Sequence, residues 1–254
     1  MNTEAKQPYS IRIATYNIGD FSGDGFLPGS EEAKSAFKRA MASVGASLWA
    51  LQEDIYWFGG VKELSPYDAI YSDYPYYKRE YTGEYNGKAF LSRFPIEDAA
   101  RVEYVGVGRF RHPWYLRGFT ELGGRRVQLI CLHFDWSDKH VRAQQITQVI
   151  EAAKSEEYTL ILGDFNPENY INDGERLDRT LLHEAEIARF TEAGFAAANG
   201  GAFGYFDTIA RASISPCPFD NIFVSPGITL DAVGKLEEPW MNDHALLWAD
   251  ITLH

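Results

Sequence analysis

Polar and ionisable residues stand at the ends of five short apolar runs that are far apart in the sequence. They are Asn17, Gln52-Glu53, His133, Asp164 with Asn166, and Asp243-His244. Active-site residues commonly lie at strand ends and in the loops beyond them, where a rigid scaffold brings distant parts of the chain together. Taken singly, each residue also has a structural explanation, such as capping a helix or stabilising a turn. Their recurrence at the ends of apolar runs predicts that they converge on one site.

This inventory fits a metal-dependent phosphoesterase, because carboxylate and amide oxygens suit Mg²⁺ while histidines transfer protons and bind phosphate. A zinc site is the alternative, with ligands from His133, Asp135, His140 and His244. The sequence offers no helical His-x-x-x-His pair and no cysteine cluster in support of zinc. We expect Asp135 and His140 to be surface or helix-start residues. We therefore predict Mg²⁺ as the cofactor, with Mn²⁺ as a substitute.

The elements that must position these residues alternate between strands and helices. Apolar patterns predict strands at 11–17, 48–52, 89–92, 101–107, 115–122, 126–132, 158–162, 219–224 and 245–253. Apolar residues at helical spacing predict helices over 33–44, 141–154 and 177–190. The stretch 65–87 has no apolar period and predicts a long surface loop, while Gly123-Gly124 predicts a hairpin within a β-meander that starts at residue 89. This order favours an α/β fold with two sheets covered by helices.

Composition limits the class of protein further. The chain has 254 residues, 45% of them hydrophobic and 24% charged, which excludes a disordered or collagen-like protein. We expect a single domain over residues 1–254, with a flexible N-terminus at 1–9. The 36 acidic residues exceed the 24 basic ones and give a net charge of −12, so the overall field repels nucleic acid. The two cysteines, Cys131 and Cys217, do not form a metal-binding or redox pattern.

Localisation is inferred from the apolar stretches and from the first residues of the sequence. No stretch of about 18 apolar residues is present, so we predict no transmembrane segment. The first residues lack the basic and then apolar segments of an export signal. As given, the sequence predicts a cytoplasmic protein, or a secreted or periplasmic one if a signal peptide has been removed. We expect it to be a monomer.

The motifs around these residues follow one another in a familiar order. They are Ala14-Thr15-Tyr16-Asn17, Leu51-Gln52-Glu53, Leu91-Ser92-Arg93-Phe94-Pro95-Ile96, Leu132-His133, Gly163-Asp164-Phe165-Asn166, Phe219-Asp220-Asn221-Ile222 and Asn242-Asp243-His244-Ala245. In their order and their residues, these motifs resemble those of the endonuclease/exonuclease/phosphatase superfamily, also called the DNase I-like fold. The resemblance extends over nearly the whole chain. The resemblance implies a four-layered α/β/β/α sandwich, in which two packed mixed β-sheets are flanked by helices. It also implies hydrolysis of a phosphodiester or phosphomonoester.

The resemblance implies roles for the residues around the metal and the attacking water. Glu53 matches the acidic metal ligand, and Asn17 matches the amide that assists the metal or the phosphate. Asp243 resembles a ligand of a second metal position. Asp164 matches the carboxylate that orients or deprotonates the attacking water. Asn166 matches the amide that holds a phosphoryl oxygen.

Two histidines complete the set that the resemblance implies. His244 matches the histidine that contacts the phosphate as a base or transition-state stabiliser, with Asp220 as its orienting carboxylate. His133 occupies the position at which DNase I and the sphingomyelinases have a histidine, so it is a candidate for protonating the leaving oxygen. The implied mechanism is in-line attack of water, with one or two Mg²⁺ ions neutralising charge on the phosphoryl oxygens.

One departure bears on the substrate. Abasic-site endonucleases carry an acidic residue two places after the strand-end asparagine, where this sequence has Gly19. Together with the negative charge, this favours a small-molecule or lipid-derived phosphoester as substrate, with a Mg²⁺-dependent nuclease as the alternative. A non-catalytic binding module is a third class, and the complete residue set argues against it. A locally basic stretch stays compatible with either a phosphate-facing or a solvent-facing role: Arg101, Arg109, Arg111, His112, Arg117, Arg125 and Arg126.

Overall fold

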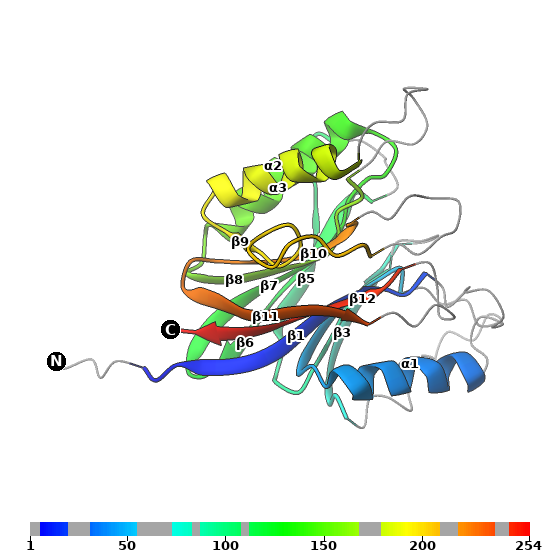
Figure 1. Ribbon diagram of the computed structural model, residues 1–254, viewed down its shortest axis with the longest axis vertical. Helices are drawn as coiled ribbons and strands as arrows, with labels where there is room; N and C mark the ends of the chain where they lie inside the picture. The colour runs from blue at the N-terminus through cyan, green and yellow to red at the C-terminus, as the bar shows by residue number, and fades with distance from the viewer. Residues whose placement is uncertain are drawn as a thin grey trace.

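The computed structural model describes most of the chain (Figure 1). The described residues are 6–19, 31–54, 73–82, 87–107, 112–167, 179–208, 218–236 and 244–254. Within them, no helix combines the length and the apolar character needed to cross a membrane.

The strands form two sheets of six strands each. The first sheet has the order β11-β12-β1-β2-β4-β3, and the second has the order β5-β6-β7-β8-β10-β9. The strands of the first are β1 (Tyr9–Asn17), β2 (Leu48–Gln52), β3 (Tyr76–Tyr81), β4 (Gly87–Ser92), β11 (Ile228–Leu236) and β12 (Leu246–Leu253). The strands of the second are β5 (Glu97–Glu103), β6 (Trp114–Leu122), β7 (Arg125–His133), β8 (Tyr158–Asp164), β9 (Ala196–Ala197) and β10 (Asp220–Val224). Both sheets are mixed, because β1 pairs with β2, and β7 with β8, in parallel, whereas the other pairings are antiparallel.

Helices cover the outer faces of the two sheets. Helix α1 (Glu31–Val44) lies on the side of the first sheet, whereas α2 (Lys139–Ala153) and α3 (Arg179–Glu192) lie together on the side of the second (Figure 1). The predicted four-layered α/β/β/α sandwich is therefore confirmed. Each layer is held by alternating side chains, because successive residues of a strand point to opposite faces.

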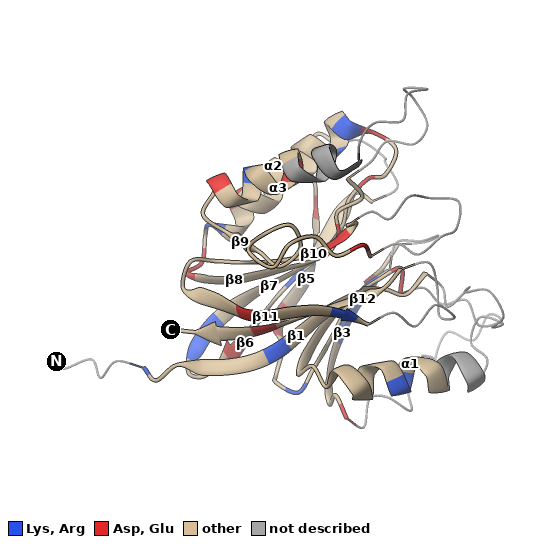
Figure 2. Ribbon diagram, in the orientation of Figure 1, with Lys and Arg blue, Asp and Glu red and all other residues tan. Residues whose placement is uncertain are grey.

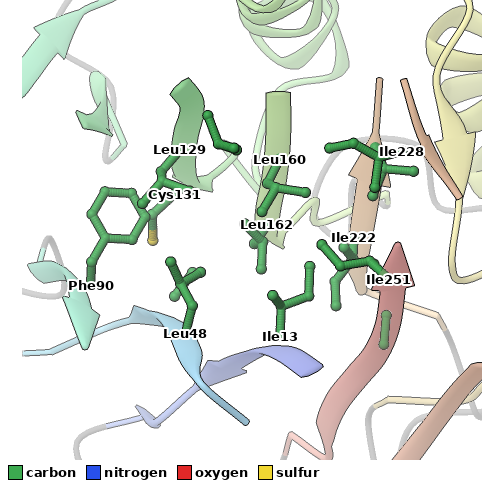
Figure 3. Packing of buried hydrophobic residues seen from close by; sticks show 14 of the residues in the cluster. Ile13, Leu48, Phe90, Leu129, Cys131, Leu160, Leu162, Ile222, Ile228 and Ile251 are labelled. Carbon is green, nitrogen blue, oxygen red and sulfur yellow. The ribbon is translucent and has the colours of Figure 1, made fainter. Parts of the chain in front are cut away.

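The largest apolar cluster lies between the two sheets. Ile13 and Leu48 from the first sheet point toward Leu129 and Leu160 from the second, as Figure 3 shows, and all four are fully buried. The neighbouring positions on these strands, such as Ile130, point outward and pack under the helices. Burial of apolar surface on both faces of each sheet contributes about 25 cal/mol per Å² and fixes the layers. It also fixes the strand register, since a slip of one residue would turn every inward side chain outward.

The structure differs from the sequence prediction mainly at sheet edges. The stretch 65–87, predicted to be a loop, contains the edge strand β3 and the start of β4. Strand β11, at the opposite edge of the same sheet, was not predicted either. Strand β3 consists of tyrosines and charged residues and has no apolar alternation. Strand β11 alternates only over its first residues, because its register shifts between Leu230 and Ala232. Strand β4 pairs in the first sheet, so the predicted meander consists of β5, β6 and β7 only.

The strand pairing confirms the predicted hairpin and bears on the predicted N-terminus. Gly123 and Gly124 form the turn between β6 and β7, and both have positive φ angles of 56° and 73°. Of the stretch 1–9, predicted to be flexible, residue Tyr9 begins β1 and the side chain of Arg125 donates hydrogen bonds to the carbonyls of Lys6 and Gln7. Residues 1–5 lie outside the described part of the chain.

Candidate active site

Three of the predicted site residues form one row across the second sheet. The parallel register of β7 and β8 pairs His133 with Asp164, and the antiparallel register of β8 and β10 pairs Asp164 with Asp220. Directly paired residues point to the same face of a sheet. This face is the inner one, because Cys131 and Leu162, two residues earlier on their strands, belong to the inter-sheet core. The row is therefore the polar end of that core.

A second row lies opposite on the first sheet. The register pairs Asn17 of β1 with Gln52 of β2, and Gln52 with Lys88 of β4. Glu53 follows directly after β2. All three paired residues are at most 1% exposed, so this row is also at the end of the core rather than on the surface. The inward-pointing side chains of these strands are thus apolar in the middle of the sandwich and polar at this end.

Asn17 connects the two rows. Its amide nitrogen Nδ2 donates hydrogen bonds to Asp164 Oδ2 at 3.0 Å and to Glu53 Oε1 at 3.2 Å. Its amide oxygen accepts a hydrogen bond from the main-chain N–H of Gly19 at 3.0 Å, which sets the orientation of the amide. A single buried side chain therefore fixes the distance between a carboxylate of the first sheet and one of the second.

His244 and Asp220 form an oriented pair. His244 Nδ1 and Asp220 Oδ2 lie 2.8 Å apart, and His244 Nε2 lies 3.7 Å from Asp164 Oδ2. An ionised Asp220 accepts a hydrogen bond from Nδ1–H, which fixes the tautomer and directs Nε2 into the site. The second oxygen of Asp220, Oδ1, is buried and has no hydrogen-bond partner among the described residues.

Asn166 follows Asp164 in a strained turn. Its φ angle of 40° lies in the left-handed region, which a non-glycine residue adopts at a cost. The main-chain N–H of Asn166 donates to Asp164 Oδ1 at 2.9 Å, and its amide Nδ2 donates to the carbonyl of Phe134 at 3.1 Å. The turn thereby holds the Asp164 carboxylate and the Asn166 side chain in fixed positions on the same edge.

Burial changes the proton affinities of the two central residues in the second sheet. Burial, followed by the charge of Asp220, raises the pKa of Asp164 to about 7, against lowering contributions from His244 and Asn17. Burial also lowers the pKa of His133 well below 6.5, and the positive charges of neighbouring residues lower it further. At neutral pH, Asp164 is therefore poised to exchange a proton while His133 is neutral.

His133 is buried, with 3% of its surface exposed, and it contacts a second histidine. Its ring stacks on that of His112 with a centroid distance of 3.6 Å, and its Nε2 lies 3.4 Å from Asp164 Oδ2. Its Nδ1 is buried and has no hydrogen-bond partner within the described residues. His112 appeared in the sequence only as part of the basic stretch, and its separation from His133 along the chain gives no sign that the rings stack.

Glu53 is held in place through the residue that follows it. Glu53 has a φ angle of 53°, again in the left-handed region. The buried Asp54 carboxylate lies 3.1 Å from Arg79 Nε and accepts a hydrogen bond from the Tyr77 hydroxyl at 3.1 Å. Gly87 is required beside it, because a Cβ there would lie 1.6 Å from the Asp54 carbonyl oxygen. The edge strand β3 therefore anchors the backbone that presents Glu53.

The donor atoms at this end fit a divalent cation. Asp164, Asp220 and His244 each offer one ligand atom, and these atoms lie within 4.8 Å of one another. The Glu53 carboxylate, which shares the Asn17 amide with Asp164, adds a further carboxylate oxygen at this end of the core. Such oxygens suit hard cations of the Mg²⁺ and Mn²⁺ type. Asp243, the remaining predicted ligand, lies outside the described residues.

The two extra residues of the alternative zinc site have structural roles. Asp135, expected at the surface or at the start of a helix, is instead fully buried. Its Oδ1 accepts hydrogen bonds from Ser137 and from the main-chain N–H of Asp138, so it shapes the loop before α2. His140 is exposed near the start of α2. Among the described residues, neither belongs to the group of possible metal ligands formed by Asp164, Asp220 and His244.

Comparison with known proteins gives a family and a set of structural neighbours. The sequence profile of the Endonuclease/Exonuclease/phosphatase family matches residues 14–241. A search among curated proteins gives no significant sequence match. An endonuclease/exonuclease/phosphatase from Beutenbergia cavernae is similar in structure with a TM-score of 0.71 and 17% identity, over 96% of this chain and 72% of that one.

Two further neighbours span almost their full length. One from Bacteroides vulgatus has a TM-score of 0.66 and 17% identity, with 96% of this chain and 99% of that chain covered. D. rerio TDP2, solved as a complex with a single-strand DNA product, has a TM-score of 0.66 and 14% identity, with 95% and 98% covered. With identities of 14% to 17%, these neighbours show that the fold is shared. Family membership follows from the sequence profile, because the profile matches residues 14–241. This chain belongs to the endonuclease/exonuclease/phosphatase family.

Proposed function

We propose that this protein is a divalent-metal-dependent hydrolase of phosphoric esters in which an activated water attacks the phosphorus atom. The observation that carries the proposal is the position of Asp164. It lies between the oriented His244–Asp220 pair on one side and the Asn17–Glu53 pair on the other. Endonucleases, exonucleases and phosphatases all break phosphoester bonds, so family membership supports the same reaction class.

Asp164 is the residue that orients and deprotonates the attacking water in this proposal. A general base works best when its pKa is near the working pH, and burial brings the pKa of Asp164 to about 7. His244, directed by Asp220, stabilises the charge that develops on the phosphoryl group. Asn166 donates a hydrogen bond to a phosphoryl oxygen, because an amide nitrogen carries two hydrogens and only one is used by Phe134.

His133 assists the leaving oxygen on the opposite side. Its pKa is lowered well below 6.5 in the protein alone, mainly by burial. A bound phosphoester brings negative charge close to the imidazole, and an opposite charge at this range raises a histidine pKa. His133 is therefore proposed to acquire its proton only in the substrate complex.

Glu53 is the main ligand of the metal in this proposal, with Asn17 and Asp243 completing its surroundings. A divalent cation bound there supplies positive charge that neutralises the phosphoryl oxygens and the leaving group. Asn17 contributes through its amide oxygen, which has a second lone pair besides the one that accepts from Gly19. Mg²⁺ is the proposed ion and Mn²⁺ its substitute.

We propose a small or lipid-derived phosphoester as the substrate, in preference to nucleic acid. The net charge of −12 opposes a polyanion, and the ribbon in Figure 2 shows acidic and basic residues interspersed along the elements in that view. Two arginines of the basic stretch have structural partners, since Arg125 binds main-chain carbonyls and Arg126 pairs with Glu156. Arg109 and Arg111 lie outside the described residues.

Aromatic residues of the stretch 65–87 divide into two groups. Tyr74 is buried and Tyr77 bonds to Asp54, so both pack onto the protein body. Tyr76 and Tyr81 are 39% and 41% exposed, which leaves their rings accessible to a ligand. The other tyrosines of the stretch lie outside the described residues: Tyr67, Tyr71 and Tyr85.

A nuclease-type phosphodiesterase is the second candidate. The observation in its favour is the structural similarity to D. rerio TDP2, which was solved with a single-strand DNA product. A substrate panel distinguishes the two candidates. Phosphomonoesters, phosphodiesters, lipid phosphoesters and oligonucleotides are incubated with the protein in Mg²⁺, Mn²⁺ or Ca²⁺, with an excess of EDTA as control. Cleavage confined to small or lipid esters supports the first candidate, and faster cleavage of oligonucleotides supports the second. No metal-dependent cleavage of any phosphoester would refute both.

A further inference from the structure

Lys88 is a buried cation next to the candidate active site. It lies on the inner face of β4, is 1% exposed, and is the register neighbour of Gln52, the residue before Glu53. Its ammonium group lies 3.9 Å from the centre of the Trp114 ring. Among the described residues, it makes no hydrogen bond and no ion pair with any carboxylate.

Two other buried cations of the same protein are satisfied. Arg125 is 2% exposed and donates hydrogen bonds to four main-chain carbonyls. Arg142 is 1% exposed and pairs with Glu186 and the carbonyl of Asp135. Lys88 is thus different from these two in having an aromatic face as its contact instead of oxygen atoms. A cation–π contact offsets only part of the cost of burying an unpaired ammonium group.

The surroundings of Lys88 keep it charged at neutral pH. Burial lowers its pKa to about 8, and the negative charges of Glu53 and Glu103 raise it in opposition. A pKa of about 8 leaves the ammonium form in the majority at pH 7. A buried positive charge without an oxygen partner favours binding of an anion.

The position of Lys88 indicates which anion this is. Lys88 and Asn17 flank Gln52 in one row, and Asn17 bonds to both Glu53 and Asp164. The charge of Lys88 also contributes to lowering the pKa of His133 on the facing sheet. An anion that contacts Lys88 would therefore lie among the same groups that the proposed reaction places around the phosphoryl group.

We propose that Lys88 is a substrate-binding residue that receives an anionic oxygen of the phosphoryl group on the His133 side of the site. This inference rests on the proposed function and adds a residue that the family motifs do not mark. The ring of Trp114 holds the side chain in position. Before substrate binds, the ammonium group lacks an oxygen partner among the described residues. It can therefore bind a phosphate oxygen without first breaking another ion pair.

The test compares Lys88→Met with Lys78→Met, a matched control on the neighbouring strand β3 where the lysine is exposed. The primary readout is the affinity of the Mg²⁺-loaded protein for inorganic phosphate, measured by titration calorimetry without turnover. Loss of a hydrogen bond to a charged group weakens binding by about 10- to 100-fold. We expect this loss for Lys88→Met, with a similar fall in kcat/KM for p-nitrophenyl phosphate, and no change for Lys78→Met.

Two further measurements separate a loss of phosphate binding from a loss of stability. Thermal melting is expected to show that Lys88→Met is at least as stable as the wild type, because an unpaired buried charge has been removed. Lys88→Arg, which keeps the charge and can stack on Trp114, is expected to recover part of the phosphate affinity. If Lys88→Met binds phosphate as well as the wild type, or gains only Mg²⁺ affinity, Lys88 is a counter-charge to Glu53 and the inference is wrong. A loss that Lys88→Arg does not recover and that follows a fall in melting temperature would also overturn it.

The outcome for the proposed function is separate. If the wild type hydrolyses no phosphoester, the proposed function fails, whereas the phosphate affinities of the variants still decide the role of Lys88.

Discussion

Replacement of Asp164 by asparagine is expected to make the metal-free protein more stable at alkaline pH and less stable at acid pH. Asp164 is 1% exposed, and its pKa is raised from 3.8 to about 7, mainly by burial. In the unfolded chain the same carboxyl ionises near its ordinary value. Between about pH 4 and pH 7 the folded protein therefore binds up to one proton more than the unfolded chain.

The sign and size of the effect follow from this difference. Because the folded state holds the extra proton, the free energy of unfolding falls as the pH rises through this interval. One pKa unit corresponds to about 1.4 kcal/mol, so a rise of the pKa from 3.8 to about 7 removes about 4 kcal/mol by about pH 8. The amide that replaces the carboxyl in Asp164→Asn does not ionise, so the variant does not lose this energy.

A smaller opposing effect acts at every pH. Asp164 Oδ2 accepts the hydrogen bond from Asn17 Nδ2, and an amide nitrogen at that place cannot accept it. The lost bond costs about 1 kcal/mol. The variant is therefore expected to be about 1 kcal/mol less stable at about pH 4 and about 3 kcal/mol more stable at about pH 8.

Urea unfolding over this pH range measures the difference. EDTA is present throughout, because a bound cation would favour the ionised carboxylate and lower its pKa. Asp98→Asn is the control, since the side chain of Asp98 is 77% exposed. The reasoning is refuted if the stability difference between Asp164→Asn and the wild type is constant over the range, as is expected for Asp98→Asn.

Further predictions concern metal binding, the leaving group and the anchor of Glu53. Glu53→Gln is expected to weaken Mg²⁺ binding in titration calorimetry by about tenfold or more, whereas Asp164→Asn mainly lowers kcat; equal weakening by both would contradict the assigned roles. His133→Ala is expected to slow esters with poor leaving groups by about 10²–10⁴-fold and p-nitrophenyl esters much less, and a loss independent of leaving-group pKa would exclude the acid role. Arg79→Met leaves the Asp54 carboxylate buried without its cation and is expected to destabilise the protein by about 3 kcal/mol in urea unfolding and to weaken Mg²⁺ binding. If Arg79→Met is destabilised but binds Mg²⁺ as tightly as the wild type, the Asp54–Arg79 pair does not position Glu53 for metal binding.

The sequence predicted most of the inner strands because their side chains are buried on both faces. Strands β1, β2, β7 and β8 read as apolar runs, and each run ends in a polar residue that the structure places at the same end of the core. The sequence order of these runs does not reveal their partners. Strand register, which sets His133, Asp164 and Asp220 side by side, depends on pairing between distant segments.

Residues whose role depends on such pairing were the ones that the sequence did not reveal. Lys88 has the same parity as the core residue Phe90, which is the only sign in the sequence that its charge points inward. Arg79 lies on an edge strand without an apolar pattern, so its pairing with Asp54 required the three-dimensional structure. In both cases the sequence shows that the residue is a cation, but it does not show which way the side chain points.

Hydrolysis of simple phosphoesters by metal-stripped protein is the most direct test of the central claim. The protein is freed of metal with EDTA, and Mg²⁺ is titrated back while release of p-nitrophenolate from p-nitrophenyl phosphate and from its bis ester is followed. His244→Ala, prepared in the same way, measures the background. We predict no release without metal, a saturable recovery with Mg²⁺ or Mn²⁺, and no recovery in His244→Ala. An undiminished rate in excess EDTA, or an equal rate from His244→Ala, would contradict metal-dependent hydrolysis at this site.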